Sequence, residues 1–123
     1  MPKAYLWDAT LVAERGFRFE NLVALHLLTL CHFLEDAEGE KVELRYLRDT
    51  SEREVDFLVT WNGKPWLAVE AKVGDTEIAP SLRYFRSRLG IPHCYQVVLD
   101  GTQDYAKDGI RCLPAARFFA GLP

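Results

Sequence analysis

The sequence predicts a mixed α/β domain whose central sheet is flanked by helices. Three features lead to this prediction: an apolar helical stretch near the N-terminus, three successive segments of strand character, and a second helix followed by another strand. The chain has 123 residues, 49% of them hydrophobic, which is enough for one compact core. We therefore expect residues 1–123 to form a single domain with an αβββαβ core.

The predicted elements follow from local pattern and from turn residues. Residues 4–7 form a short apolar run typical of a strand, and in residues 17–35 apolar side chains occupy nearly every face of a helix, which indicates burial. Gly39 marks the turn that follows. The remaining predicted elements, in order, are strands at 42–48, 54–61 and 65–73, a helix at 77–89 capped by Thr76 with Pro80 in its first turn and Gly90 after its end, a strand at 94–99, a loop at 100–109, a short strand at 110–113, and a helix to residue 122 that Pro114 opens as its first residue.

The dipeptide Asn62-Gly63 predicts a hairpin between the second and third of these strands. Two registers are open. A two-residue turn places Asp56 and Glu70 on opposite faces of the sheet. A three-residue loop with a bulge makes them diagonal neighbours on the same face, about 7 Å apart at the backbone. We expect the second register, because only that one brings the two carboxylates together.

Three charged side chains interrupt these apolar strands: Asp56, Glu70 and Lys72. Burying such charges costs several kcal/mol each unless they are paired or bind a metal. Glu70 and Lys72 are two residues apart in a strand and therefore point to the same face. Two carboxylates suit a magnesium-type ion, which would bind phosphate oxygens and lower the pKa of a coordinated water, while Lys72 stabilises charge developing on phosphorus. This combination indicates phosphodiester hydrolysis.

Together with Glu20 on the preceding helix, Asp56 and the triplet Glu70-Ala71-Lys72 resemble the motif of the PD-(D/E)XK nuclease superfamily. The resemblance implies a restriction-endonuclease-like fold, Mg²⁺ or Mn²⁺ as cofactor and DNA as substrate. It also implies that Asp56, Glu70 and the Ala71 carbonyl are metal ligands. By the same resemblance Lys72 is the charge stabiliser and Glu20 an auxiliary acid near the metal.

A narrower resemblance extends over nearly the whole chain. It is carried by Tyr5-Leu6-Trp7-Asp8, Arg18-Phe19-Glu20-Asn21-Leu22-Val23-Ala24, Tyr46-Leu47-Arg48-Asp49, Arg53-Glu54-Val55-Asp56-Phe57 and Ser81-Leu82-Arg83-Tyr84-Phe85. These segments are similar to the C-terminal domain of unknown function carried by a family of bacterial and archaeal AAA-type ATPases. Members of that family have a P-loop ATPase ahead of this domain, but nothing here matches G-x-x-x-x-G-K-[ST]. We expect a fragment, a detached domain or a degraded gene product, with a P-loop AAA ATPase domain or chain as its implied partner.

A function of another class is also open: a noncatalytic docking or regulatory domain of an ATPase, in which the same charged residues form a buried ion-pair cluster. The formal net charge of −3 favours it, because no global positive field attracts the chain to nucleic acid. Contact with DNA must come from local basic patches, for which solvated surface charge is the alternative explanation. The candidate DNA-contacting residues are Arg48, Arg53, Arg83 and Arg86.

Cysteine usage and the N-terminus suggest the cellular setting. Cys31, Cys94 and Cys112 are far apart and odd in number, without the paired spacing of zinc sites or disulfide frameworks, so we expect reduced thiols. The sequence has no basic-then-apolar leader and no apolar stretch long enough to span a bilayer. We expect a cytoplasmic protein without a membrane partner.

Overall fold

The computed structural model of the chain describes residues 3–74 and 77–122, with the backbone alone described for residues 3–12. The described elements are, in order, α1 (Lys3–Glu38), β1 (Val42–Arg48), β2 (Glu54–Trp61), β3 (Lys64–Lys72), α2 (Pro80–Leu89), β4 (His93–Val98), β5 (Tyr105–Lys107), β6 (Ile110–Pro114) and α3 (Ala115–Ala120). In this part of the chain six strands form one mixed sheet, in the order β1-β2-β3-β4-β6-β5. The predicted αβββαβ core and the mixed sheet flanked by helices are confirmed.

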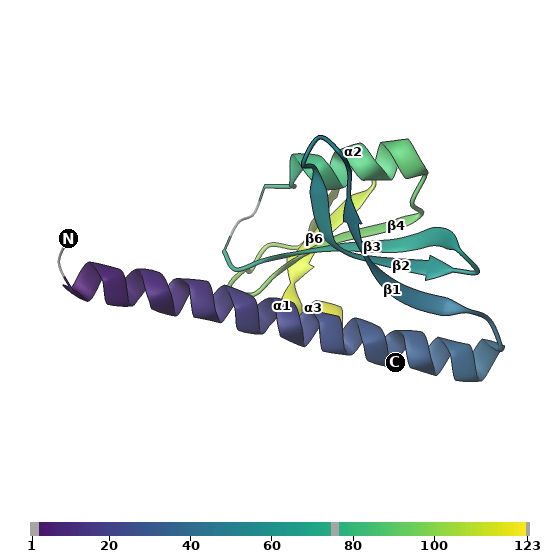
Figure 1. The fold of residues 1–123 in the computed structure, drawn as a ribbon, viewed down its shortest axis with the longest axis horizontal. Coiled ribbons are helices and arrows are strands. Elements are labelled where there is room, and N and C mark those ends of the chain that lie inside the picture. The colour runs from purple at the N-terminus through teal and green to yellow at the C-terminus, as the bar shows by residue number, and fades with distance from the viewer. Residues whose placement is uncertain (1–2, 75–76, 123) are drawn as a thin grey trace.

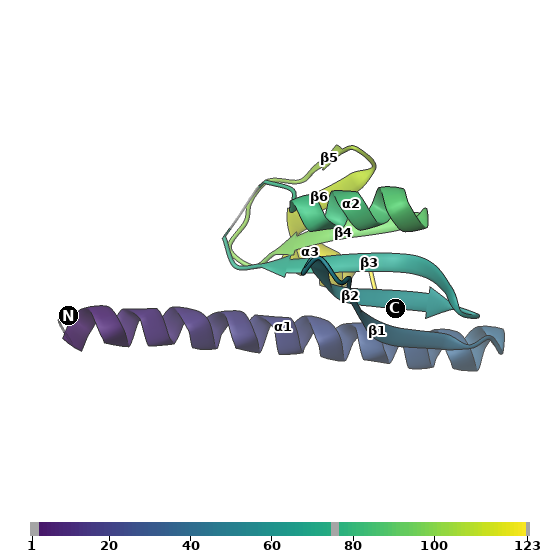
Figure 2. The same ribbon diagram turned by 45° about the horizontal axis from the view of Figure 1, so that its top comes forward.

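Helices cover both faces of the sheet (Figure 1). α1 and α3 lie along one face and α2 along the other, as the second view also shows (Figure 2). β1, β2 and β3 are antiparallel neighbours, whereas β3, β4 and β6 run parallel to one another. The parallel pairing of β3 with β4 requires a crossover between them, and α2 provides it.

Each helical layer has its own apolar core on its face of the sheet. α1 contributes Val23 and Leu27 to a cluster that includes Val59 of β2. α2 contributes Leu82 and Phe85 to the cluster on the opposite face. Because the central strands are covered on both faces, they consist of nearly continuous apolar runs, and a charged side chain within them is exceptional.

The first helix is longer than predicted and is buried on one side only. α1 begins at Lys3, so the strand predicted at residues 4–7 is wrong; the run is too short for periodicity to separate strand from helix, and helix-forming residues follow it. The helix predicted at 17–35 is confirmed, but its outward face exposes large apolar side chains instead of burying them. The N-terminal part of α1 extends past the sheet (Figures 1 and 2). None of the helices within residues 3–74 and 77–122 has the length and apolar character needed to cross a bilayer.

Several details of the C-terminal half differ from the prediction. α2 begins at Pro80, three residues later than predicted, and the predicted cap Thr76 lies outside the described residues. Gly90 ends this helix in the left-handed conformation (φ 64°), as predicted. The loop predicted at 100–109 contains β5, which is too short to show a strand period and pairs antiparallel with β6. Pro114 is the N-cap of α3 and not its first helical residue.

The β2–β3 hairpin turns on two residues. Asn62 (φ 52°) and Gly63 (φ 80°) both have positive φ, and Trp61 pairs with Lys64 across them. Positive φ at both central residues is characteristic of a type I′ turn, whose twist matches that of the flanking strands. The prediction of a three-residue loop is therefore wrong.

An extra residue in β3 shifts the register just beyond this turn. Thr60 pairs with Pro65, but Val59 pairs with Leu67, so β3 has one more residue than β2 over this interval. Proline has no N–H to donate to a ladder and is found in strands mainly at edges and at bulges. The bulge thus supplies the one-residue shift that the prediction had assigned to the turn.

The shifted register decides where the two acidic side chains lie. Phe57 pairs with Val69, and continuing this register by one residue brings Asp56 level with Glu70. The predicted diagonal arrangement is therefore replaced by a directly opposed one. The prediction that a two-residue turn separates these carboxylates is also wrong, because it did not include a bulge.

A second irregularity affects β2 in the interval that contains Asp56. On the side of β1, Arg45 pairs with Leu58, whereas Leu47 pairs with Val55, so here β2 has the extra residue. A bulge bends its strand and changes the direction in which the local side chain points. The backbone between Val55 and Leu58, which includes Asp56, therefore departs from regular pairing on the edge that faces β1.

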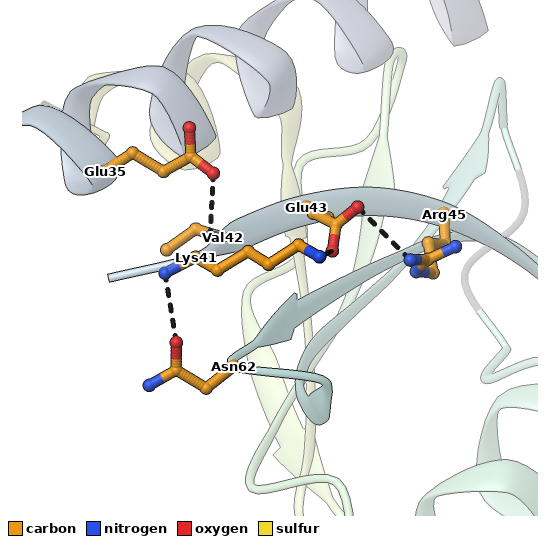
Figure 3. Close-up of polar contacts among 6 residues, drawn as sticks. All are labelled: Glu35, Lys41, Val42, Glu43, Arg45 and Asn62. Carbon is orange, nitrogen blue, oxygen red and sulfur yellow. Dashed lines mark hydrogen bonds and ion pairs between the residues drawn. The ribbon is translucent and has the colours of Figure 1, made fainter. Parts of the chain in front are cut away.

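The hairpin turn and the end of α1 both form hydrogen bonds with the start of β1 (Figure 3). The Asn62 side-chain oxygen accepts a hydrogen bond from the Lys41 N–H at 3.0 Å, and the Asn62 N–H donates to the Lys41 carbonyl at 2.7 Å. On α1, the Glu35 carboxylate accepts from the Val42 N–H at 3.0 Å. The turn and the helix are thus tied to the same short segment, which fixes α1 relative to the hairpin.

Replacing Gly63 with alanine should lower the free energy of unfolding by about 1 kcal/mol, because a Cβ is disfavoured in the left-handed conformation. Equilibrium unfolding in urea measures the change. Gly74→Ala is the matched control: it lies outside the left-handed region with nothing within 4 Å of an added Cβ, and should not destabilise the chain. Equal losses in the two variants would contradict the turn geometry.

Candidate functional site

The Asp56 carboxylate lies against the backbone of β3 and the side chain of Glu70. Its Oδ2 accepts a hydrogen bond from the Ala71 N–H at 2.9 Å, and its side chain is hydrogen-bonded to that of Glu70. Glu70 is only 7% exposed, whereas Asp56 is partly exposed. The two carboxyl groups identified from the sequence are therefore neighbours, and the pair is open to solvent on the Asp56 side.

The Glu70 carboxyl group holds a proton at neutral pH. Burial is the main cause that raises its pKa, and the hydrogen bond and negative charge of Asp56 raise it further, against the opposing charge of Lys72, to about 9. A shared proton removes the repulsion that two carboxylates in contact would otherwise experience. The proton on Glu70 thus relieves the contact between the two acidic side chains.

Glu20 lies near Asp56, and Lys72 acts electrostatically on both Glu20 and Glu70. Burial raises the pKa of Glu20, the negative charges of Asp56 and Glu54 raise it too, and the positive charge of Lys72 lowers it. These electrostatic effects require Glu20 of α1 to lie near both strands. The four residues predicted to form the site therefore come from three elements, α1, β2 and β3. Asp56 and Glu70 are in contact, Lys72 acts electrostatically on Glu70, and Glu20 lines the same hollow as Asp56.

Two hollows open beside this group. One, of about 530 Å³, is lined by Glu20 and Asp56 together with residues of β1 and β2. The other, of about 510 Å³, is lined by Lys72, Arg83 and Lys107 on the side of α2. A ligand could thus reach the carboxyl pair from the first hollow and the ammonium group from the second.

The donor set fits a divalent cation, although it is small. Within residues 3–74 and 77–122, no three His, Cys, Asp or Glu side chains lie close enough together to hold a metal ion among themselves. Asp56 and Glu70 supply two carboxyl groups in contact, and Ala71, the third predicted ligand, contacts Asp56 through its backbone N–H. Oxygen ligands of this kind are those that Mg²⁺ takes, usually one or two carboxylates with several waters.

The four arginines predicted to contact DNA are in different surroundings. Arg48 lines the hollow of Asp56, where it forms hydrogen bonds of 2.8 and 3.1 Å to a glutamate of β2. Arg83 lines the second hollow, as Lys72 does. Arg53 lies over the ring of Tyr84 in α2 at 4.0 Å and forms an ion pair with Asp49. The guanidinium of Arg86 packs against Gly109, which follows β5. The structure therefore brings two of the four to the site, and their contact with DNA stays a prediction.

Three residues near the site were not identified from the sequence. Tyr46 and Glu54 line the Asp56 hollow. The sequence favoured a packing role for Tyr46 and gave no role to Glu54. Gln96 is fully buried on β4, paired with Glu70 in the parallel ladder. Its amide binds the backbone N–H of Ala79 and the Glu77 carbonyl, which holds the start of α2 next to the site. In the sequence, the one feature that could have identified Gln96 is that its amide side chain interrupts the mainly apolar run 93–98.

The cysteines contribute no chemistry to the site. Cys31, Cys94 and Cys112 are all buried, and none of them is in a disulfide. Burial raises the pKa of the Cys31 thiol and of the Cys94 thiol to about 11, so both are protonated and weakly nucleophilic at neutral pH. This agrees with the expected reduced thiols.

Replacing Glu70 with glutamine should flatten the dependence of stability on pH. The Glu70 pKa is higher in the folded chain, about 9, than its ordinary value of 4.5, so the native state binds more protons between these values and stability falls as pH rises through them. Glutamine has no proton to lose, so the Glu70→Gln variant should have a higher free energy of unfolding than the native chain at about pH 8. Equilibrium unfolding in urea measures the difference. The exposed Glu38→Gln variant should keep the wild-type slope. An unchanged slope in Glu70→Gln would contradict the shared proton.

Comparison with known proteins gives a family but no activity. No curated protein matches the chain, and no solved structure matches it. The family found is one of unknown function, which agrees with that part of the sequence resemblance and does not extend to the nuclease superfamily or to an ATPase. The matched range includes all four residues of the site. With residues 15–118 matching the family described as "Domain of unknown function (DUF4143)", the chain belongs to that family.

Proposed function

We propose that the chain is a divalent-metal-dependent nuclease-like domain of the PD-(D/E)XK type, which hydrolyses phosphodiester bonds of DNA. The observation that supports this most strongly is the contact between Asp56 and Glu70, with Lys72 two residues further along the same strand. A buried carboxyl pair is costly in a sheet that is otherwise apolar. A cation that binds the pair in place of its proton gives that arrangement a use.

The residues of the chain have distinct roles in this proposal. Asp56, Glu70 and the Ala71 carbonyl would hold Mg²⁺ or Mn²⁺, which would polarise the phosphate and supply a water of lowered pKa. Lys72 places its ammonium group where negative charge develops on the phosphorus oxygens. Glu20 has a raised pKa and lies near Asp56, which suits a carboxylate that orients the attacking water or accepts its proton.

The local charge around the site supports an anionic substrate despite the net charge of −3. Arg48 lies on one side of the carboxyl pair, and Lys72, Arg83 and Lys107 line the hollow on the other. Arg83 is held by an ion pair to an aspartate at 3.3 Å, so its guanidinium is already oriented along this surface. Phosphates on both sides of a scissile bond would find basic partners there.

A second candidate is the noncatalytic docking or regulatory domain of a P-loop AAA ATPase. The observation that favours it is that the carboxyl pair is already satisfied within the chain, since Glu70 shares its proton with Asp56 and Asp56 accepts from the Ala71 N–H. Such a pair can remain as a purely structural network. Binding of an AAA ATPase partner that survives both Asp56→Asn and Glu70→Gln, in a chain without cleavage activity, would favour this candidate.

Cleavage of DNA in Mn²⁺ or Mg²⁺ should be lost on Lys72→Met, with a fall in rate of about 100-fold or more, because the developing charge loses its partner. The assay uses labelled duplex, single-stranded and branched DNA. Lys64→Met is the matched control: this lysine lies exposed at the other end of β3 and its loss should change the rate by no more than about twofold. Absence of cleavage by the native chain on every substrate would refute the proposal.

Metal binding should release a proton. At about pH 7 the cation must displace the proton of Glu70, so the calorimetric heat should depend on the ionisation enthalpy of the buffer and correspond to roughly one proton per ion. Asp56→Asn should abolish binding, whereas Glu38→Gln should leave it unchanged. Binding without any buffer dependence would place the cation away from the carboxyl pair.

A further inference from the structure

The outward face of α1 has an apolar patch that no described part of the chain covers. Its five large side chains are 41–64% exposed, although the same helix is fully buried on the sheet side. The patch consists of Phe17, Leu22, Leu25, Leu28 and Phe33. Exposed apolar groups of this size on one element usually mark an interaction surface.

The spacing of this patch is symmetric about Leu25. Leu22 and Leu28 lie three residues before and after it, and Phe17 and Phe33 lie eight residues before and after it. At about 100° per residue, the leucines lie about 60° and the phenylalanines about 80° to either side of Leu25, so all five share one face. Reading outward from Leu25, the helix presents the same side-chain types in both directions.

The polar residues of this face follow the same symmetry. Asn21 and Thr29 lie four residues from Leu25, and Arg18 and His32 lie seven residues from it, on opposite sides. Amide is matched with hydroxyl and guanidinium with imidazole. In a two-fold contact both partners use the same patch, so residues at equal distances before and after its centre face each other and must be compatible.

We propose that two copies of this chain associate through α1, with the helices antiparallel and a two-fold axis passing beside Leu25. At the centre, Leu25 of one copy contacts Leu25 of the other. Leu22 then shares a level with Leu28 of the second copy, and Phe17 shares a level with Phe33 of the second copy, on opposite flanks of the seam. Side chains that alternate across the seam in this way fill the space between antiparallel helices.

The charged side chains beside the patch are compatible with this arrangement. Antiparallel pairing places Arg18 about one helical turn from Asp36 of the second copy, and Glu14 about one turn from His32 of the second copy. Arg18 is strongly exposed and pairs with Glu14 in its own helix, so a small movement brings it to the second acid. The same register sets Glu14 level with Asp36 of the second copy and Arg18 level with His32 of the second copy, on opposite flanks of the seam, so each acid has a basic side chain one turn away on its own flank.

The size of the patch is adequate, and its position leaves the site free. The five side chains expose on the order of 500 Å² of apolar surface per copy, about the apolar share of a standard interface. Glu20 lies about 140° around the helix from Leu25, so the carboxyl pair and both hollows face away from the contact. Each copy would keep an independent site.

Sedimentation of the native chain should show a dimer at tens of micromolar, and Leu25→Glu should weaken association by at least about 100-fold, because two carboxylates then meet at the axis. Leu89→Glu is the matched control: this leucine is similarly exposed, but lies on α2 in the other layer, and its loss should leave the dimer intact. Circular dichroism checks that both variants fold. A native chain that stays monomeric at about 100 µM, or a Leu25→Glu variant that still dimerises, would overturn the proposal and leave the face to another protein.

Crosslinking tests the register independently of affinity. A thiol-reactive crosslinker spanning about 10 Å should join Phe17→Cys to Phe33→Cys in an equal mixture of the two variants, and should join neither variant to itself, since like positions are then about 24 Å apart. The native cysteines are buried, and the native chain measures their background. Self-crosslinking of Phe17→Cys would indicate a parallel dimer and refute the proposed arrangement.

Discussion

The bulge at the start of β3 determines whether this chain has a site at all. The Asn62-Gly63 turn by itself would leave Asp56 and Glu70 on opposite faces of the sheet, one in each apolar core. The extra residue beside Pro65 restores the common face and places the two carboxyl groups at the same level. The hydrogen bond between them, the protonation of Glu70 and the electrostatic influence on Glu20 all depend on that one-residue shift.

A buried carboxyl pair is a costly feature in a small domain, and its surroundings limit the cost. Asp56 accepts a backbone hydrogen bond, the pair shares a proton, and the ammonium group of Lys72 partly offsets the remaining charge. On the next strand Gln96 uses its amide to hold the start of α2, so the helix that borders the second hollow is fixed from within. The same network that makes the acids tolerable also holds Lys72 and Arg83 at one hollow. Structure and proposed chemistry therefore depend on the same contacts.

Much of the fold was predictable, because the signals are local. β1 and β2 begin and end where the alternation and turn residues indicated, and Gly90 ends α2 in the predicted conformation. Residues 4–7 were misassigned because a four-residue apolar run has no period. The register of the hairpin was not predictable either, since a bulge depends on both strands and Pro65 by itself only permits one. Asp56, Glu70 and Lys72 were found because charge in an apolar strand is rare, whereas Tyr46 and Glu54 become part of the hollow only through the fold.

The family assignment leaves the chemistry to be established by experiment, and the position of a bound ion decides it most directly. Anomalous diffraction from crystals of the chain soaked in Mn²⁺ at about pH 8 would locate the ion without relying on activity. The account predicts one strong peak between the Asp56 and Glu70 carboxylates, within ligand distance of the Ala71 carbonyl. A structure with the hairpin folded as described, but with no peak between those two side chains, would contradict it.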